Sequence, residues 1–302
     1  MLSVLIPIFN HDVTRLVGEL TMQCSKAKIP FQILCFDDGS KEKYLVANRA
    51  LDGVYGVSYI ELGTNIGRSA IRNKLAYNAM YDYLLFLDCD SEIRSKKFIK
   101  RYVNEMKQKV PIVYGGRQYS KRPPRSKKKR LHWTYGVKRE ARPAKRRAKL
   151  GNLAFQSNNY LITRDLALEF PFDENIRGYG HEDTMLALRL QSAHHFIKHI
   201  DNPILHRGVE ETKNFLEKTK EGLCNLVLLR QEYPIMKTPV TSAYDTLRGM
   251  WMHKVFRWIY NRWEDRIMEN LYGTNPSMRL FDFYKLYHYS RYVENGTPDK
   301  KG

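Results

Sequence analysis

Long apolar runs and cysteine pairs are what this 302-residue sequence lacks. No stretch of 18 consecutive apolar residues occurs, so we expect no transmembrane helix. The four cysteines have no CxxC spacing, which gives no indication of a zinc site or a disulfide, and we expect reduced, buried thiols. Residues 1–7 lack the basic region and the apolar length of a signal peptide, so we expect a cytoplasmic protein.

Acidic residues are nearly absent from one basic segment, residues 117–149. It holds fifteen Lys and Arg and one acid, Glu140, and so carries +14 of the chain's net charge of +19. Pro123, Pro124 and Pro143 argue against regular structure, and we expect a mobile loop. So many charges cannot be buried unpaired, so the segment should be solvated or bound to anions. Solvated disorder, attraction to anionic lipid head groups or a lipid-diphosphate acceptor, and nucleic-acid binding stay open as interpretations.

Short apolar segments alternate with helical patterns through the first 115 residues. This alternation, with short connections, favours a parallel sheet with right-handed crossovers. The predicted fold class is α/β, with a doubly wound, mostly parallel sheet and a helical C-terminal extension. The expected strands are residues 2–9, 31–36, 57–62, 83–87, 111–114, 154–162 and 196–200, and the expected helices are residues 12–26, 44–51, 68–81, 99–106 and 184–193.

The predicted strand Tyr83–Leu87 runs directly into two carboxylates, Asp88 and Asp90. Its apolar run is typical of a strand buried on both faces. Acids at the carboxyl end of such a strand lie where open α/β sheets bind ligands. Mg²⁺ and Mn²⁺ are bound by one or two carboxylates together with substrate phosphates. The alternative is an Asp-x-Asp that only caps a helix.

Five motifs occur in order along the chain, and together the sequence resembles inverting GT-A glycosyltransferases of family 2, of the type that builds bacterial polysaccharides or glycolipids. The resemblance implies a GT-A fold and a nucleotide-sugar donor. The motifs are Pro7-Ile8-Phe9-Asn10, Asp37-Asp38-Gly39-Ser40, Asn65-x-Gly67-Arg68-x-x-x-Arg72-Asn73, Asp88-Cys89-Asp90 and Glu182-Asp183.

The resemblance implies a set of nucleotide-binding residues. Asp38 would accept a hydrogen bond from the imide N–H of uracil, although a turn built on Asp-Gly is the alternative. Arg68 and Arg72 lie one helical turn apart and would face the diphosphate, or else form a solvated helix face. Phe9 would stack on the base, or else lie in the core. The whole set is Pro7, Phe9, Asp38, Asn65, Arg68, Arg72 and Asp88.

The same resemblance implies a metal site, a base and an acceptor site. Asp90 and His206 would bind Mn²⁺ or Mg²⁺, which neutralises the leaving diphosphate, and an imidazole ligand suits Mn²⁺ better. Asp183 would take the proton of the acceptor hydroxyl, because an inverting transfer needs one such base. Glu182 and Gly180 would bind the acceptor. The alternatives are a surface histidine and two acids that complement a helix N-terminus.

The resulting hypothesis is a metal-dependent inverting glycosyltransferase that moves a sugar from a nucleotide diphosphate, with UDP expected, to a hydroxyl of a glycan or lipid-linked acceptor. The alternatives are a nucleotidyltransferase and a nucleic-acid-binding protein on an inactive GT-A scaffold. We expect no nucleic acid as a partner, and an anionic inner membrane face as the surface for peripheral binding. The expected segments are a nucleotide-sugar-binding half at 1–116, the basic loop at 117–150, an acceptor-binding and catalytic half at 151–212 and the helical extension at 213–302.

Residues 247–271 are expected to form one helix. Its Leu247, Trp251, Val255, Trp258, Ile259, Trp263 and Ile267 would lie near one face. Such a stripe packs against the protein's own core or, with its many arginines and lysines, lies on a membrane.

Overall fold

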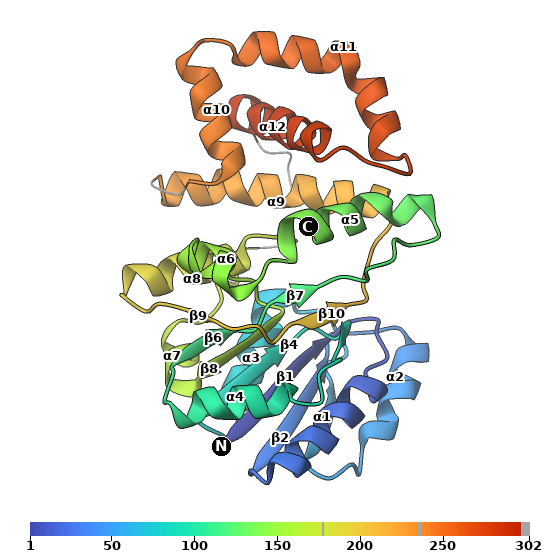
Figure 1. Ribbon diagram of the computed structural model, residues 1–302, viewed down its shortest axis with the longest axis vertical. Coiled ribbons are helices and arrows are strands. Elements are labelled where there is room, and N and C mark those ends of the chain that lie inside the picture. The colour runs from blue at the N-terminus through green and yellow to red at the C-terminus, as the bar shows by residue number, and fades with distance from the viewer. Residues whose placement is uncertain (177, 235–236, 297–302) are drawn as a thin grey trace. The chain divides into compact units, whose positions relative to one another are not determined.

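The computed structural model describes residues 1–176, 178–234 and 237–296, and the chain divides into two compact units (Figure 1). Unit 1 comprises residues 1–120, 140–176 and 182–208. Unit 2 comprises residues 121–139, 177–181 and 209–302. The chain therefore passes between the units several times. The predicted divisions at residues 116, 150 and 212 do not coincide with these boundaries.

A seven-stranded sheet in the order β3-β2-β1-β4-β8-β6-β9 forms the centre of unit 1. The first four strands of the chain are parallel to one another, whereas β8 runs antiparallel to both of its neighbours. A second sheet has the order β5-β10-β7. The strands are β1 (Leu2–Ile8), β2 (Phe31–Asp37), β3 (Val57–Glu61), β4 (Tyr83–Leu87), β5 (Ser91–Glu92), β6 (Ile112–Tyr114), β7 (Arg117–Gln118), β8 (Asn159–Thr163), β9 (Lys198–His199) and β10 (Ile204–His206).

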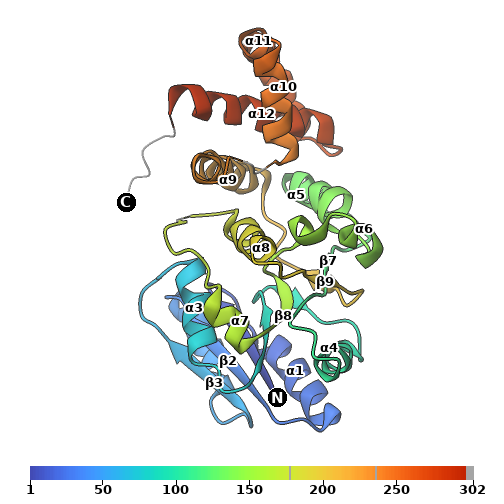
Figure 2. The ribbon, with the colours of Figure 1, turned by 90° about the vertical axis from the view of Figure 1, so that its left-hand side faces the viewer.

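Helices cover both faces of the large sheet, with α1 and α4 on one face and α3 and α7 on the other (Figure 2). This confirms the α/β class with a mostly parallel sheet. The helices of unit 1 are α1 (Thr14–Ala27), α2 (Glu42–Asn48), α3 (Arg68–Tyr77), α4 (Phe98–Lys107), α6 (Ala144–Ala148), α7 (Arg164–Glu169) and α8 (Glu182–Ser192), with 3₁₀ turns at Arg49–Leu51 and Gly151–Ala154.

Side-chain alternation along β1 divides the core of unit 1 into two layers. Val4 and Ile6 pack in the layer beneath α1 and α4, whereas Leu5 packs in the layer beneath α3. Successive residues of a strand point to opposite faces, so a strand buried on both sides must be apolar throughout. Phe86 of β4 stacks on Tyr160 of β8, with ring centroids 4.8 Å apart. The predicted burial of the strand that precedes Asp88 is confirmed.

Unit 2 is helical and has its own aromatic-rich core, which includes Leu131, Phe215, Tyr260 and Phe281. Its presence confirms the predicted helical C-terminal extension. Within the part of the chain that the structure describes, no helix is both long and apolar enough to cross a membrane. The elements are α5 (Arg130–Tyr135), α9 (Thr212–Glu232), α10 (Pro239–Gly249), α11 (His253–Leu271) and α12 (Met278–Asn295), with a 3₁₀ turn at Lys127–Lys129 and a short π-helix at Gly136–Glu140.

The expectation that the basic segment lacks regular structure is wrong, because α5, α6 and two further short helices lie within it. Pro143 does not interrupt a helix, since it is the N-cap residue of α6, where the missing N–H leaves no helical hydrogen bond unmade. Leu131 of α5 is fully buried in the core of unit 2.

Arg147 corrects the expectation that every charge of the basic segment is solvated or bound to an anion. Its guanidinium group is buried and donates to the carbonyl oxygens of Tyr114, Gly115 and Ile200. A buried cation is tolerated where carbonyls accept its hydrogen bonds. Gly116 permits this arrangement, because a Cβ there would lie 2.7 Å from Arg147 Nη2 and its φ is +96°.

Candidate active site

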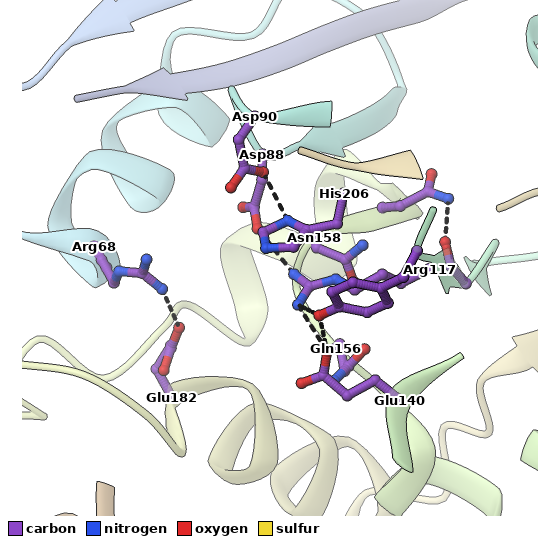
Figure 3. Close-up of polar contacts among 12 residues, drawn as sticks. Arg68, Asp88, Asp90, Arg117, Glu140, Gln156, Asn158, Glu182 and His206 are labelled. Atoms are coloured by element: carbon purple, nitrogen blue, oxygen red, sulfur yellow. Dashed lines mark hydrogen bonds and ion pairs between the residues drawn. The ribbon is translucent and has the colours of Figure 1, made fainter. Parts of the chain in front are cut away.

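Asp88 follows β4 directly, and two arginines hold its carboxylate in place, of which Figure 3 labels Arg117. Arg72 of α3 donates from Nη2 to Oδ1 at 2.9 Å, and Arg117 of β7 donates from Nη2 to Oδ2 at 3.4 Å. Both arginine side chains are buried or nearly so. Paired charged hydrogen bonds fix the orientation of a carboxylate. The site predictions placed Arg72 on the diphosphate, and the structure gives it Asp88 as a protein partner.

Arg117 extends this network to residues that the sequence analysis did not include in the site. Its Nη1 lies 3.3 Å from Glu140 Oε2, and the Tyr119 hydroxyl donates to the same carboxylate oxygen. Burial disfavours the cation, but Glu140, Tyr119 and Asp88 raise the pKa of Arg117 well above its usual value. The signal for Arg117 in the sequence was a cation that follows the predicted strand 111–114 after two glycines. The charge of the basic segment obscured it.

Asp90 directly precedes β5 and lies beside His206, the last residue of β10, the strand that pairs with β5 (Figure 3). Asp90 Oδ1 and His206 Nδ1 are 3.2 Å apart. Burial alone would raise the pKa of Asp90, but the hydrogen bond and the charge of His206 outweigh it and hold that pKa below its usual range. The sequence prediction of these two residues as partners therefore agrees with their placement, although 116 residues separate them.

The donor set of Asp90 and His206 fits a divalent ion that shares its shell with a substrate. Among the described residues, no group of three or more His, Cys, Asp or Glu is arranged to hold a metal by itself. One carboxylate and one imidazole leave most of an octahedral shell to water and diphosphate oxygens, as Mg²⁺ and Mn²⁺ sites commonly do. The imidazole favours Mn²⁺. Asp88, held by two arginines, is the less available carboxylate.

Gly208 leaves room for the Asp90 carboxylate, because it has no Cβ. A Cβ at residue 208 would lie 2.0 Å from Asp90 Oδ2 and 3.1 Å from His206 Cε1. We therefore expect Gly208→Ala to displace the carboxylate and to weaken Mn²⁺ binding by ~10–100-fold, the range seen when the support of a metal ligand is lost. Calorimetric Mn²⁺ titration in the presence of UDP measures this. Gly18→Ala is the control, since nothing lies within 4 Å of its Cβ; equal metal affinity of both variants would contradict the prediction.

Asp38 holds the loop between β3 and α3 by two hydrogen bonds to its backbone. Its carboxylate accepts from Ile66 N at 2.7 Å and from Gly67 N at 3.2 Å, and burial raises its pKa. Asn65 Oδ1 also accepts from Gly67 N, at 3.1 Å. Gly39 lets this loop approach, because a Cβ there would lie 3.0 Å from Asn65 N. These contacts leave Asp38 with lone pairs for a further donor.

Phe9 and Pro7 stand at the carboxyl end of β1, next to the end of β2. Phe9 is 50% exposed, so its ring is not the core side chain that the alternative interpretation required. Pro7 is partly exposed within β1. The backbone N–H of Asp38 donates to Ile8 O at 2.8 Å, which ties the two strand ends together. Phe9 and Asp38 thus come from neighbouring strand ends, as expected for parallel strands.

Glu182 begins α8 and faces the two arginines of α3. Its Oε1 lies 3.8 Å from Arg68 Nη1 and 3.9 Å from Arg72 Nη1. Glu182 is buried, whereas the Arg68 side chain is 47% exposed. Arg68 therefore keeps a solvent-facing cation at the site, and Arg72 does not. Glu182 was predicted as an acceptor-binding residue, and its immediate neighbours are these cations.

Asp183 has the most perturbed carboxyl group near this network. Burial and the neighbouring Glu182 raise the pKa of Asp183 to about 7. The backbone N–H of Thr184 donates to its Oδ1 at 2.7 Å, and the charges of Arg72 and Arg117 act against the rise. A carboxyl whose pKa is near neutrality can exchange a proton at physiological pH.

Gly180, the other predicted acceptor residue, belongs to unit 2. Its carbonyl accepts from Asn225 Nδ2 at 3.1 Å, and a Cβ at residue 180 would lie 3.2 Å from Gly222 Cα. With φ at +96°, it adopts a conformation that favours glycine. These contacts explain the glycine by its packing on α9.

Residues 3–169 match the sequence model of the family described as Glycosyl transferase family 2. Over 125 residues the chain is 30% identical to the chondroitin synthase of Pasteurella multocida (strain Pm70), a match that covers 39% of this chain and 12% of that protein. Over 117 residues it is 32% identical to an uncharacterized glycosyltransferase of Haemophilus influenzae, covering 38% of each. The matches thus span well under half the length of both relatives.

Solved structures resemble the chain over most of its length. The mannosyltransferase PcManGT from Pyrobaculum calidifontis, in complex with GDP-Man and Mn²⁺, has a TM-score of 0.59 at 13% identity, covering 97% of this chain and 86% of that one. TarS of S. aureus in complex with UDP-GlcNAc has a TM-score of 0.51 at 14% identity, covering 99% and 93%. At these identities the likeness is one of fold, and the predicted GT-A fold is confirmed.

Proposed function

The chain belongs to glycosyl transferase family 2, and from this premise we propose that it is a metal-dependent, inverting glycosyltransferase. Its donor would be a nucleotide diphosphate sugar and its acceptor a hydroxyl of a glycan or a lipid-linked glycan. The observation that carries the proposal is that one buried cation, Arg72, lies 2.9 Å from Asp88 and 3.9 Å from Glu182. The Asp-x-Asp motif with the predicted metal ligand and the Glu-Asp pair with the predicted base thus meet at the same arginine.

Each residue of the site has a role in this proposal. Asp183 accepts the proton of the acceptor hydroxyl as the new bond forms, and its raised pKa suits a base that works near neutral pH. Arg68, the exposed cation of α3, faces the diphosphate. Asp90 and His206 would hold Mn²⁺ or Mg²⁺, which neutralises charge on the leaving diphosphate.

The nucleotide would bind at the ends of β1 and β2. The exposed ring of Phe9 offers a stacking surface for the base, with Pro7 beside it. Asp38 keeps lone pairs for the imide N–H of uracil, and Asn65 orders the neighbouring loop. Arg72 and Arg117 orient Asp88 toward the ribose or the sugar.

The donor is UDP-linked in this proposal. A carboxylate such as Asp38 can accept a hydrogen bond from the imide N–H of uracil. One structural neighbour is a complex with UDP-GlcNAc. The other neighbour is a complex with GDP-Man, so guanosine donors form the comparison set. The chondroitin and hyaluronan synthases among the relatives support a polysaccharide acceptor.

A donor-hydrolysis screen tests this function. Purified protein is incubated with Mn²⁺ and a panel of UDP-, GDP- and dTDP-sugars without an acceptor, and nucleotide release is followed by chromatography. We expect slow release from a UDP-sugar and none after chelation of the metal. Release from a GDP-sugar alone would contradict the assignment of UDP as the nucleotide, but it would still support a glycosyltransferase. Failure of every donor, both without acceptor and with a panel of oligosaccharide acceptors, would contradict the transferase itself.

We further propose that the exposed part of the basic segment attracts the protein to an anionic membrane. Lys127, Lys128 and Lys129 are consecutive and exposed in unit 2. Each cation near an anionic surface contributes about 1 kcal/mol, and salt weakens this attraction. Removal of the whole segment is not a usable test, because Leu131 belongs to the core of unit 2.

Replacing Lys127, Lys128 and Lys129 by glutamate reverses their charge. We expect this change to weaken binding to phosphatidylglycerol vesicles by at least ~10-fold at low salt. Vesicle co-sedimentation measures the change, and raising the salt should weaken wild-type binding in parallel. The control variant reverses Lys96, Lys97 and Lys100, which are exposed in unit 1 and change the net charge equally. Equal losses in both variants would mean that total charge, and not this segment, governs the attraction.

A further inference from the structure

One exposed apolar face of α11 has no role in the core of unit 2 or in the proposed reaction. Val255, Trp258, Ile259 and Trp263 follow i, i+3, i+4 and i+8 spacing, so they lie on one side of the helix. All four are exposed. Arg262 and Arg266, at i+7 and i+11, share this side and are exposed too. These six residues are called the α11 face below.

The other side of α11 explains why this face points outward. Phe256, Tyr260, Ile267 and Leu271 are buried there, in the core of unit 2. Within unit 2, α12 lies between α11 and α9 (Figures 1 and 2). The α11 face is therefore turned away from the packed helices of its own unit.

The expectation of one continuous helix over residues 247–271 is wrong at its start. α10 ends at Gly249 and α11 begins at His253. Trp251 lies between them with a φ of +57°, a left-handed conformation that no helix interior allows. The predicted stripe is therefore exposed from Val255 to Trp263, and only its last member, Ile267, is buried.

Two of the four tryptophans in the chain lie on the α11 face, Trp258 with 69% and Trp263 with 47% exposure. Trp251, just before α11, is 84% exposed. Leaving such large apolar side chains in water forgoes the gain of burying them. Exposed apolar clusters of this kind mark interaction surfaces.

The charge around these tryptophans identifies the kind of partner. Arg262 and Arg266 are accompanied on the same side of α11 by two exposed acids, Asp265 and Glu269, so the charge that favours an anionic partner is that of the whole unit. The Arg266 guanidinium lies 4.6 Å from the centroid of the Trp263 ring. Unit 2 contains 25 Lys and Arg against 12 Asp and Glu, a net charge of +13. A second copy docked by a two-fold axis would bring two units of this positive net charge together. Lipid phosphates would instead complement this charge.

We propose that the α11 face docks on the surface of an anionic lipid bilayer. Trp258 and Trp263 enter the boundary between head groups and acyl chains, where tryptophan is enriched, and Arg262 and Arg266 reach the lipid phosphates. This inference deepens the membrane association proposed above and rests on it. The basic segment supplies attraction over distance, and the α11 face supplies the apolar insertion.

The test compares two matched double variants of the full chain on vesicles of phosphatidylcholine with and without phosphatidylglycerol. The double variant Trp258→Ser with Trp263→Ser removes the two side chains that are proposed to insert into the bilayer. Phe196→Ser with Leu228→Ser is the control, because these side chains are 69% and 46% exposed and lie outside the α11 face. We expect the tryptophan variant to bind anionic vesicles at least ~10-fold more weakly, a loss of one decade or more in the partition constant. The control should stay within ~2-fold.

Further readouts separate the possible failures. Wild-type tryptophan emission should shift to the blue with anionic vesicles, and the tryptophan variant should lose most of that shift. If the tryptophan variant binds vesicles as wild type does, while charge reversal of Lys127–Lys129 still weakens vesicle binding, the proposal for the α11 face alone would be wrong. A wild-type dimer that the variant converts to monomer in sedimentation velocity would also overturn it. Absence of any wild-type vesicle binding would overturn both membrane proposals, while donor hydrolysis tests the transferase independently.

Discussion

Asp183→Asn is expected to lower the rate of sugar transfer by ~10²–10⁴-fold, the usual contribution of a general base. Donor and metal affinity should stay unchanged, because Asp183 is assigned to the acceptor side. The asparagine retains an Oδ1 that can accept from Thr184 N, as the aspartate does at 2.7 Å. The change therefore removes the proton acceptor while keeping this local hydrogen bond.

The pH dependence of the wild-type enzyme provides an independent check on Asp183. Its pKa is raised to about 7, so the carboxyl is protonated, and inactive as a base, below that pH. Transfer should rise with pH and level off above about 7. In the same window the folded protein holds a proton that the unfolded chain, with an ordinary carboxyl pKa of 3.8, has already lost. The wild-type protein therefore loses stability from this group as pH rises from about 4 to about 7.

The asparagine variant should lose this destabilisation and melt at the same or a higher temperature at pH 8. A slow but stable variant separates loss of the base from loss of the fold. Asp165→Asn is the matched control, because Asp165 also lies in the first turn of a helix, α7, and is exposed. Wild-type transfer rates in Asp183→Asn would place the base elsewhere. Equal losses in both variants would favour a helix-terminal role for the acid.

The sequence was sufficient to predict the strand ends that build the site. An apolar run such as Leu84–Leu87 must be buried on both faces, and the polar residue that follows must lie at the sheet edge. The same reasoning placed Asp38 beside Phe9, since parallel strands end at one edge. Local patterns thus predicted which residues lie at the carboxyl edge of the sheet.

The pairings between distant residues could not be predicted in the same way. Arg117 contacts Asp88 and Glu140 across sequence separations of 29 and 23 residues. Only the folded chain brings such charges together, and a buried cation is acceptable where acids or carbonyl oxygens surround it. In the sequence, Arg117 is one of fifteen basic residues in its segment. The composition of the segment predicted that all fifteen side chains are solvated, whereas in the folded chain Arg147 is buried and Arg117 nearly so.

Asp90→Ala is expected to remove the dependence of UDP binding on Mn²⁺. Asp90 is the carboxylate beside His206, and Gly208 keeps space open around it. Its neighbour Asp88 cannot readily replace it, because Arg72 and Arg117 hold that carboxylate at 2.9 and 3.4 Å. With the imidazole as the only remaining ligand, we expect UDP affinity in Mn²⁺ to fall by at least ~100-fold, to the metal-free value.

Calorimetric titration of UDP into wild-type and variant protein, with Mn²⁺ and with chelator, measures this effect. The variant should remain folded, because Asp90 follows a strand and its backbone carbonyl still accepts from Arg207 N at 3.0 Å. Asp52→Ala, which removes an exposed carboxylate from the same unit, controls for the loss of one negative charge. If Asp90→Ala binds UDP in Mn²⁺ as tightly as wild type, the ion is held elsewhere. The contact between Asp90 and His206 would then be a structural ion pair, like those that hold Asp88.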